Sequence, residues 1–144
     1  MKFVGELLSA KGTDVWSVTP EQTVLAALVL MAEKEVGALM VMEGEALVGI
    51  FSERDYARKV VLKGKSSRDT PVSEVMSAPV VTVGPDQSIE ECMSLMTEKR
   101  TRHLPVLENE KLIGLISIGD VVKAVILDRE AVIGQLEGYI TGTL

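Results

Sequence analysis

The chain has 144 residues, of which 47% are hydrophobic, and a net charge of −6. This length suits one compact domain or two joined half-domains, and the hydrophobic share argues against disorder. The acidic charge and an aromatic content of 3% argue against a binder of nucleic-acid polymers. The single cysteine, Cys92, excludes an intramolecular disulfide, and the chain has neither a signal-peptide pattern nor an apolar stretch of roughly 18 residues. We therefore expect a soluble cytoplasmic protein with no membrane partner.

The chain begins with a predicted helix. Residues 1–12 fit a helix that ends at Gly12, because glycine is common where helices terminate. After a short β run, Thr19 is predicted to be the N-cap of the next helix and Pro20 its first residue. Gln22 is the expected capping-box partner of Thr19.

Three β runs and a second helix complete the first half of the chain. The β runs fall at 15–18, 38–42 and 46–51, and the polar turn Glu43-Gly44-Glu45 joins the last two. The second helix is expected at about 53–62. The helix between the first two β runs carries an apolar face at the i, i+3, i+4, i+7 spacing, formed by Val24, Ala27, Leu28 and Met31.

The second half of the chain repeats the first without a gap. Pro20 matches Pro85 at an offset of 65, and the register holds through to Asp55 and Asp120. We therefore expect β runs at 80–83, 104–107 and 112–117, with a last helix from Asp120 that residues 130–139 either continue or pack beside. Identical pairs include Gln22 and Gln87, Met31 and Met96, Leu39 and Leu104, Gly49 and Gly114, and Ser52 and Ser117.

The predicted fold class is α/β (α+β), with tandem β-α-β-β-α repeats related by a pseudo-twofold axis. One repeat of roughly 50–60 residues is too small for a comfortable core, so we expect the two sheets to pair. The segment 70–76 is predicted to form a short capped helix that leads into the second repeat. The predicted boundaries are 1–12 for the N-terminal helix, 13–62 for repeat one, 63–78 for a connector, 79–127 for repeat two and 128–144 for a C-terminal helix or tail.

A Gly-x-x-Ser-x-x-Asp motif stands at the end of the third β run of each repeat, at 49–55 and 114–120. A serine followed three residues later by an acid is typical of a helix N-cap, which explains one such motif without any ligand. The same geometry suits a nucleotide. The helix start and the serine hydroxyl can donate to a phosphate, the carboxylate can accept from ribose hydroxyls, and the glycine permits close backbone approach. The two interpretations are compatible, because a capping side chain can also contact a ligand.

The duplicated units resemble the cystathionine-β-synthase-type (CBS) domain pair, or Bateman module, over about residues 13–127. Both motifs are complete, and Arg102-His103-Leu104-Pro105-Val106 also matches a frequent pattern of that family. The resemblance implies a cleft between paired repeats for an adenosine nucleotide such as AMP, ADP, ATP or NAD(H), or for S-adenosylmethionine. It assigns ribose to the motif aspartates, phosphate to the motif serines, and adenine to apolar residues of the neighbouring β runs. The candidate nucleotide-binding residues are Gly37, Ala38, Ser52, Arg54, Asp55, Val81, Arg100, Arg102, His103, Pro105, Ser117 and Asp120.

The two candidate sites differ in charge. Arginine matches phosphate geometry and stays charged, so a cluster of cations in repeat two predicts a different phosphate affinity or a different ligand. The alternative is a solvated helix end, where cations favour the helix dipole. The sequence does not show which cleft the cluster faces. The aligned pairs are Glu35 with Arg100, Gly37 with Arg102, Ala38 with His103, and Arg54 with Gly119.

Three further side chains are of types that can carry chemistry or bind a ligand. Cys92 aligns with Ala27 on the apolar helix face, which favours a small core residue over a nucleophile. His103 is the only histidine, so neither a histidine-based metal cluster nor a required cofactor is expected. Trp16 fits either the core or a ligand or dimer surface.

The expected function is that of a regulatory module which binds an adenine nucleotide and acts in trans on an unidentified partner protein. The resemblance also implies a homodimer, to which residues 1–12 and the terminal helix contribute. One alternative is a structural dimerisation module with vestigial ligand sites. The other is a small enzyme that acts on a nucleotide, but the sequence shows no evident nucleophile–base pair or metal cluster, so we expect no catalysis.

Overall fold

A computed structural model describes residues 2–141, and the side chains of residues 2–129, 133 and 134. Residues 1 and 142–144, which fall in the predicted N-terminal helix and C-terminal tail, lie outside the described residues. The chain divides into two compact units, Asp14–Val81 and Met1–Thr13 with Thr82–Leu144. Each unit contains one sequence repeat, and each combines helices with a small sheet, which confirms the predicted fold class.

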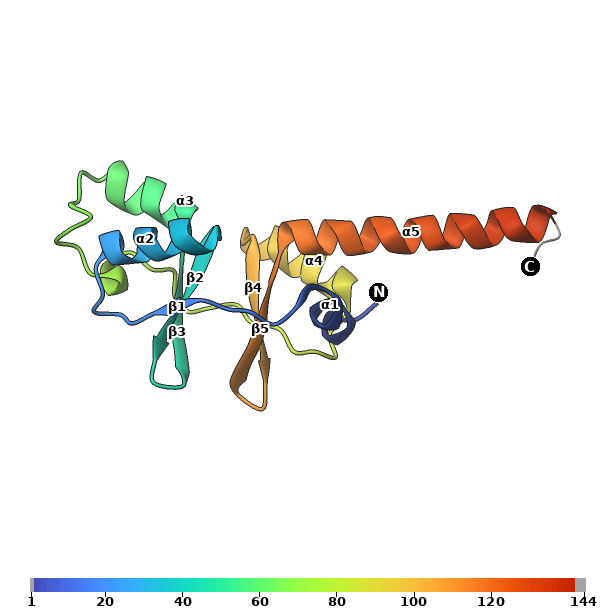
Figure 1. Cartoon of the computed structure of the whole chain (residues 1–144), viewed down its shortest axis with the longest axis horizontal. Helices are drawn as coiled ribbons and strands as arrows, with labels where there is room; N and C mark the ends of the chain where they lie inside the picture. The colour runs from blue at the N-terminus through green and yellow to red at the C-terminus, as the bar shows by residue number, and fades with distance from the viewer. Residues whose placement is uncertain (1, 142–144) are drawn as a thin grey trace. The chain divides into compact units, whose positions relative to one another are not determined.

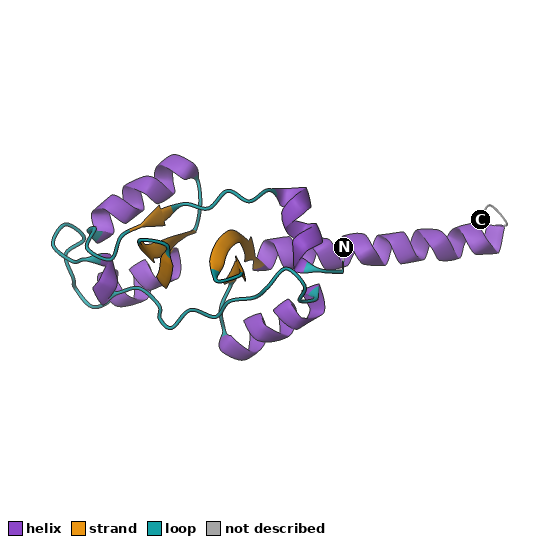
Figure 2. Cartoon of the chain, turned by 90° about the horizontal axis from the view of Figure 1, so that it is seen from below, coloured by secondary structure: helices purple, strands orange, loops and turns teal. Residues whose placement is uncertain are grey.

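The unit Asp14–Val81 contains a three-stranded sheet in the order β1-β2-β3. Strand β1 is parallel to β2, and β2 is antiparallel to β3. Helices flank these strands (Figure 2). The elements are β1 (Ser17–Val18), α2 (Val24–Lys34), β2 (Ala38–Glu43), β3 (Ala46–Ser52), α3 (Glu53–Asp55), the π-helix η1 (Tyr56–Val61) and the 3-10 helix η2 (Val72–Glu74).

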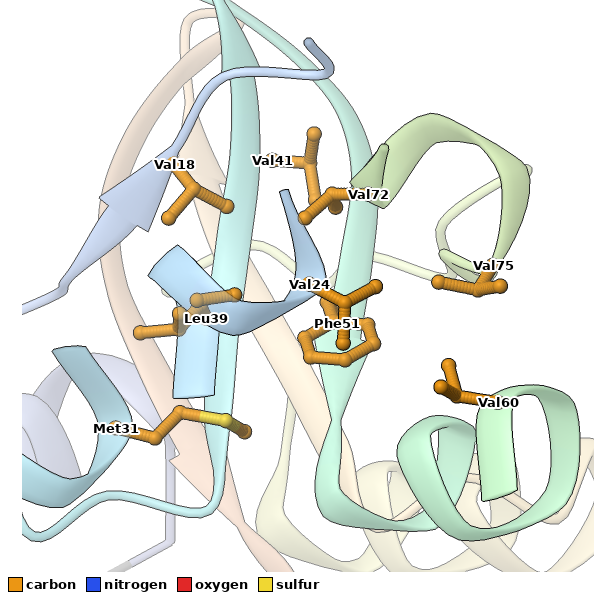
Figure 3. Close-up of a cluster of buried hydrophobic side chains, with 10 residues drawn as sticks. Val18, Val24, Met31, Leu39, Val41, Phe51, Val60, Val72 and Val75 are labelled. Atoms are coloured by element: carbon orange, nitrogen blue, oxygen red, sulfur yellow. The ribbon is translucent and has the colours of Figure 1, made fainter. Parts of the chain in front are cut away.

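The core of this unit lies between the sheet and its helices (Figure 3). Val24, Ala27 and Met31 are buried and Leu28 packs against them, which confirms the predicted apolar face of α2. Two core residues, Val72 and Val75, come from the segment that follows the repeat. The remaining core residues are Val18, Leu39, Val41, Phe51 and Val60.

The second unit is built around the antiparallel pair β4 (His103–Glu108) and β5 (Lys111–Ser117). Helix α1 (Val4–Lys11) ends at the C-cap Gly12, whose φ of 101° is in the region that favours glycine, so the predicted helix end is confirmed. The other helices are α4 (Ile89–Lys99) and α5 (Ile118–Thr141). Helix α5 continues into the predicted tail as far as Thr141 and extends well beyond α4 and α1 (Figure 1).

The predicted start of the first repeat helix was wrong. Helix α2 begins at Val24, and its N-cap is Thr23, whose hydroxyl accepts from the Ala26 N–H. The predicted partners Thr19 and Gln22 do bond to each other, but they close a turn that precedes the helix. The carbonyls of Pro20 and Gln22 accept N–H groups of the segment around Val72 and are therefore not available to a helical turn.

Two further elements depart from their prediction. Residues Val80–Val83 do not form a strand. Within them only Val83 makes an isolated β-bridge, with Val106. The helix expected at 53–62 is a short α-turn followed by a π-helix, in which the Leu62 N–H donates to the Ala57 carbonyl five residues earlier. The short helix predicted at 70–76 is present as the three-residue η2, but its N-cap, Pro71, makes no side-chain capping hydrogen bond, so the predicted cap is wrong.

The segment that completes each unit comes from outside its repeat. The N–H of Val72 donates to the Gln22 carbonyl, and the N–H of Val4 donates in the same way to Gln87. The two segments share a sequence pattern, Val-x-Glu-x-x-Ser-Ala, at 4–10 and 72–78. Helix α1 therefore occupies in the unit of repeat two the place that the segment after repeat one occupies in its own unit.

Candidate functional site

The first motif forms a capping box at the end of β3. Ser52 is the N-cap of α3, and its hydroxyl accepts from the Asp55 N–H at 3.3 Å. The Asp55 Oδ2 accepts from the N–H of Ser52 at 3.0 Å and from its hydroxyl at 3.1 Å. The interpretation as a helix cap is therefore correct, and the same contacts fix the positions of both side chains.

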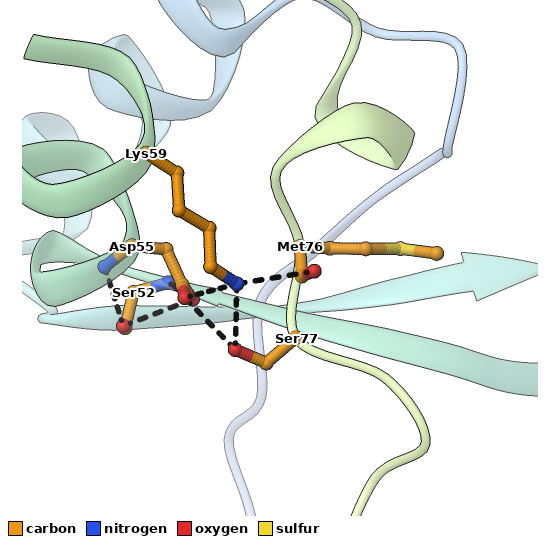
Figure 4. A network of polar contacts seen from close by, with 5 residues as sticks. All are labelled: Ser52, Asp55, Lys59, Met76 and Ser77. Carbon is orange, nitrogen blue, oxygen red and sulfur yellow. Dashed lines mark hydrogen bonds and ion pairs between the residues drawn. The ribbon is translucent and has the colours of Figure 1, made fainter. Parts of the chain in front are cut away.

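The second oxygen of the Asp55 carboxylate joins the motif to the segment that follows the repeat (Figure 4). Ser77 donates to Oδ1 at 2.8 Å, and the Lys59 ammonium lies 3.0 Å from the same atom. Lys59, which belongs to η1, also donates to the Ser77 hydroxyl at 3.3 Å and to the Met76 carbonyl at 3.5 Å. Asp55 is 6% exposed, so this carboxylate is buried and satisfied on both of its oxygens.

The second motif has the same cap but a different cation. The Asp120 Oδ2 accepts from the Ser117 N–H at 2.8 Å, and the Asp120 N–H donates to the Ser117 hydroxyl at 3.2 Å. The ammonium of Lys11, from α1, lies 2.6 Å from the same Oδ2 and 2.9 Å from the Leu115 carbonyl. Burial alone would raise the pKa of Asp120, but the hydrogen bond and charge of Lys11 and the bonds from Ser117 outweigh it and lower that pKa.

The motif glycines serve packing in this structure. A Cβ on Gly49 would meet the side chain of Met76, and a Cβ on Gly114 would stand 2.7 Å from the Leu8 Cδ2. The close approach that the sequence predicted is therefore made by the chain itself. Met76 and Leu8 belong to the two segments that complete the units from outside the repeats.

In repeat one, two of the predicted site residues lie beside the motif serine. Ala38 pairs with Ser52 in the sheet, and the Gly37 carbonyl accepts from the Glu53 N–H at 3.1 Å. Arg54 is exposed on α3, one residue before Asp55. The structure therefore brings these residues together with the motif at one end of the β2–β3 hairpin.

In repeat two, the predicted cation cluster lies beside the motif of its own repeat. His103 pairs with Ser117, and the Arg102 carbonyl accepts from the Ile118 N–H at 2.9 Å. Arg100 is the C-cap of α4, with a left-handed φ of 51°, and it occupies the same position as Glu35, whose φ is 55°. The cluster thus begins at a helix end and continues into the strand next to the serine.

The two remaining predicted site residues are less directly connected to the motifs. Pro105 is buried in β4, where its carbonyl accepts from the Val83 N–H. Val81 is half-buried and belongs to no strand.

The structure also settles the environment of Trp16 and Cys92. Trp16, the residue before β1, is 37% exposed, and the Lys34 ammonium lies 4.3 Å from the centre of its ring. Trp16 is therefore a surface residue and not a core residue. Cys92 is buried on α4, and burial raises the pKa of its thiol to about 11. Among the described residues, no group of three or more histidine, cysteine or acidic side chains is placed to hold a metal ion. No helix within that part of the chain is long and apolar enough to cross a membrane.

Sequence reasoning missed the cations and the serine that contact the motif carboxylates. Lys59 follows Asp55 by one helical turn, a spacing that predicts an ion pair. Lys11 and Ser77 lie outside the repeats as first aligned. The shared Val-x-Glu-x-x-Ser-Ala pattern could have identified their segments, but its offset of 68 differs from the 65 of the repeats.

Comparisons with known proteins agree with this architecture. The family model "CBS domain" matches residues 4–62 and 72–127. The chain is 41% identical to the CBS domain-containing protein CBSX3, mitochondrial, of Arabidopsis thaliana over 99% of this chain and 70% of that protein. A solved protein with CBS domains from Burkholderia ambifaria MC40-6 is 56% identical and superimposes with a TM-score of 0.84, covering 88% of this chain and 95% of the other.

A more distant solved structure contains ligands. It is the CBS domain pair of protein MJ0100 in complex with 5′-methylthioadenosine and S-adenosyl-L-methionine. It is 18% identical to this chain and superimposes with a TM-score of 0.76 over 85% of this chain and 94% of the other. At this identity the likeness shows a shared fold. The family match spans most of the chain in two copies, and the chain therefore belongs to the CBS domain family, as a pair of CBS repeats.

Proposed function

We propose that this protein is a regulatory module that binds an adenosine-containing ligand through its two Ser–Asp motifs and does not catalyse a reaction. One observation carries the proposal: the motif serine and aspartate are held at a helix start in both repeats, with the same capping hydrogen bonds. CBS-domain pairs generally bind adenosine ligands in regulatory roles. The two ligands bound by the MJ0100 domain pair support an adenosine compound as the class, and AMP, ADP, ATP, NAD(H) and S-adenosylmethionine are the candidates.

In this proposal the residues of each motif bind different parts of the ligand. Asp55 or Asp120 accepts hydrogen bonds from the ribose hydroxyls, and Ser52 or Ser117 donates to a phosphate at the helix start. Exposed Arg54 adds charge in repeat one. Adenine packs against apolar residues of the neighbouring strands. The basic residues of repeat two are Arg100, Arg102 and His103, and the apolar or backbone contacts are Gly37, Ala38, Val81 and Pro105.

We further propose that the module acts in trans, as a homodimer, on a partner protein. Helices α1 and α5 are the proposed contributors to the dimer. Ile118, Val122, Ile126 and Ile133 are large apolar residues left exposed along α5, as expected of a helix that associates with another surface. The cytoplasm is the proposed compartment, although the relative CBSX3 is a mitochondrial protein.

A thermal-shift panel with AMP, ADP, ATP, NAD, NADH and S-adenosylmethionine tests the proposal. A ligand that binds only the folded protein stabilises it by about 2.7 kcal/mol at a hundredfold excess over its Kd. Ser52→Ala and Ser117→Ala should reduce the shift. Ser88→Ala is the matched control, because Ser88 caps α4 with the same hydrogen bonds and lies outside both motifs. A shift that is equal in all three variants would contradict the assignment of the motifs.

A second candidate function has its own observation. Both oxygens of Asp55 are already bonded within the chain, as expected if that motif serves structure alone. A structural dimerisation module with vestigial sites would show no thermal shift with any of the six ligands.

A further inference from the structure

The two motif carboxylates differ in how the chain holds them. Asp55 uses both oxygens and is 6% exposed. The side chain of Asp120 is 23% exposed, and its bonds to Ser117 and Lys11 fall on the single oxygen Oδ2. Asp120 is therefore the carboxylate that a ligand reaches with less rearrangement.

The cations also come from different places. Lys59 lies one turn after Asp55 in the same helical segment, so it can leave the carboxylate by rotating its own side chain. The position in repeat two that matches Lys59 is Ala124, which is buried and carries no charge. Its role is taken by Lys11, at the C-terminal end of α1, 109 residues away in sequence.

Helix α1 is attached to its unit at two ends. The N–H groups of Val4 and Gly5 donate to the Gln87 and Pro85 carbonyls, and Leu8 packs over Gly114. At the other end, Lys11 bonds to Asp120 and to the Leu115 carbonyl, and Gly12 then ends the helix. The Lys11 ammonium is thus the polar contact that joins the last turn of α1 to the motif.

We infer that Lys11 determines ligand affinity at Asp120 and couples occupancy of that motif to the last turn of α1. This inference rests on the proposed function. Two ribose hydroxyls need both carboxylate oxygens of Asp120. A ligand at repeat two therefore uses Oδ1 and competes with the Lys11 ammonium for Oδ2, which displaces Lys11 and frees the end of α1. In repeat one the cation belongs to the motif's own helical segment, and the segment from outside the repeat contacts Asp55 through the Ser77 hydroxyl instead.

Calorimetric titration of the full chain with AMP, ADP, ATP, NAD, NADH and S-adenosylmethionine tests the affinity. Lys11→Met should bind the nucleotide up to about fivefold more tightly than the wild type does, because fivefold is the contribution expected of a partly exposed ion pair. Lys11→Arg keeps the cation and should bind as the wild type does. Lys65→Met is the matched control, because Lys65 forms an exposed ion pair with Glu74 at 3.5 Å and belongs to the other unit of the chain.

Amide hydrogen exchange tests the coupling. The Gly12 N–H donates to the Leu8 carbonyl at 2.8 Å and reports on the last turn of α1. Saturating nucleotide should speed exchange at Gly12 in the wild type, and ligand-free Asp120→Asn should speed it as well. Unchanged or weaker binding by Lys11→Met, or unchanged exchange at Gly12, overturns the inference while the proposed function stands. Failure of the wild type to bind any nucleotide overturns the proposed function and this inference with it.

Discussion

Gly49 lies directly against the side chain of Met76, and a Cβ placed on this glycine would stand 2.9 Å from the Met76 Cγ. The strand that carries the first motif is therefore packed against the segment after the repeat. Gly114 and Leu8 repeat the relationship in the other unit. In both units the glycine of the motif admits a side chain from a segment outside the repeat, and that segment also contacts the motif aspartate.

Alanine at either glycine should destabilise the protein. Overpacking of a well-filled contact costs about 1–3 kcal/mol. Gly114→Ala should cost more than Gly49→Ala, because leucine is branched and methionine adapts its shape more readily. Urea unfolding of each variant measures the free energy of unfolding.

Gly84→Ala is the control for these two variants. The nearest atom to a Cβ there is the Leu107 carbonyl oxygen at 3.8 Å, an ordinary contact. Equal stabilities for Gly84→Ala and Gly114→Ala would show that the packing of Leu8 does not explain the glycine of the motif.

Replacement of Asp55 by asparagine should lower stability by about 1–3 kcal/mol, because a buried group then lacks its partner. An amide nitrogen cannot accept from Ser77 or pair with Lys59, so one end of the side chain loses both contacts. Chemical denaturation of Asp55→Asn and of Lys59→Met checks this. Lys59→Met should cost less, since 42% of the Lys59 side chain is exposed. If Lys59→Met were less stable than Asp55→Asn, the buried Asp55 carboxylate would not be the centre of this network.

The ion pair of Asp120 predicts a dependence of stability on pH. The pKa of Asp120 is lowered in the folded state, so the pair contributes fully above the unfolded value of about 3.9 and is lost as the pH falls through the lower folded value. The wild type should exceed Lys11→Met in stability by no more than about 1 kcal/mol near neutral pH. That difference should vanish in acid below the folded pKa. A difference that persists unchanged in strong acid would show that Lys11 acts by packing instead.

Cys92 should resist alkylation in the folded protein. Burial raises the pKa of this thiol to about 11, and the thiolate is the reactive form. Iodoacetamide at about pH 8 should react at least about a hundredfold faster in denaturant, where the thiol regains an ordinary pKa of about 8.5. Rapid alkylation without denaturant, followed by mass spectrometry, would contradict the buried position of Cys92.

The repeats and the motifs were predictable because both rest on local sequence patterns. The apolar face of α2, the hairpin turn at Gly44 and the end of α1 at Gly12 follow from spacing and from glycine. The helix start at Thr23 was not predictable, since Thr19 and Pro20 form an equally good local signal for a helix start. The carbonyls of Pro20 and Gln22 are instead bonded to a segment about fifty residues later, a contact that no local pattern reveals.

The sequence identified the serines and aspartates of the candidate site but not the lysines that contact the aspartates. Ser52, Asp55, Ser117 and Asp120 are fixed by a motif of seven residues. Lys11 reaches Asp120 across the chain, and its position depends on how α1 packs over Gly114. The proposed difference in ligand binding between the two repeats therefore has a second cause besides the arginines. The lysine at Asp55 comes from the motif's own helical segment, whereas the lysine at Asp120 comes from α1.

The proposed function requires that the two Ser–Asp motifs bind an adenosine-containing ligand. Isothermal titration of the full chain with AMP, ADP, ATP, NAD, NADH and S-adenosylmethionine, beside the double variant Ser52→Ala with Ser117→Ala, tests it most directly. We expect saturable binding of at least one ligand to the wild type. Binding should be weakened about tenfold or more in the double variant, which corresponds to about 1.4 kcal/mol, and retained in Ser88→Ala. Absence of binding to the wild type, or equal binding by the double variant, would contradict it.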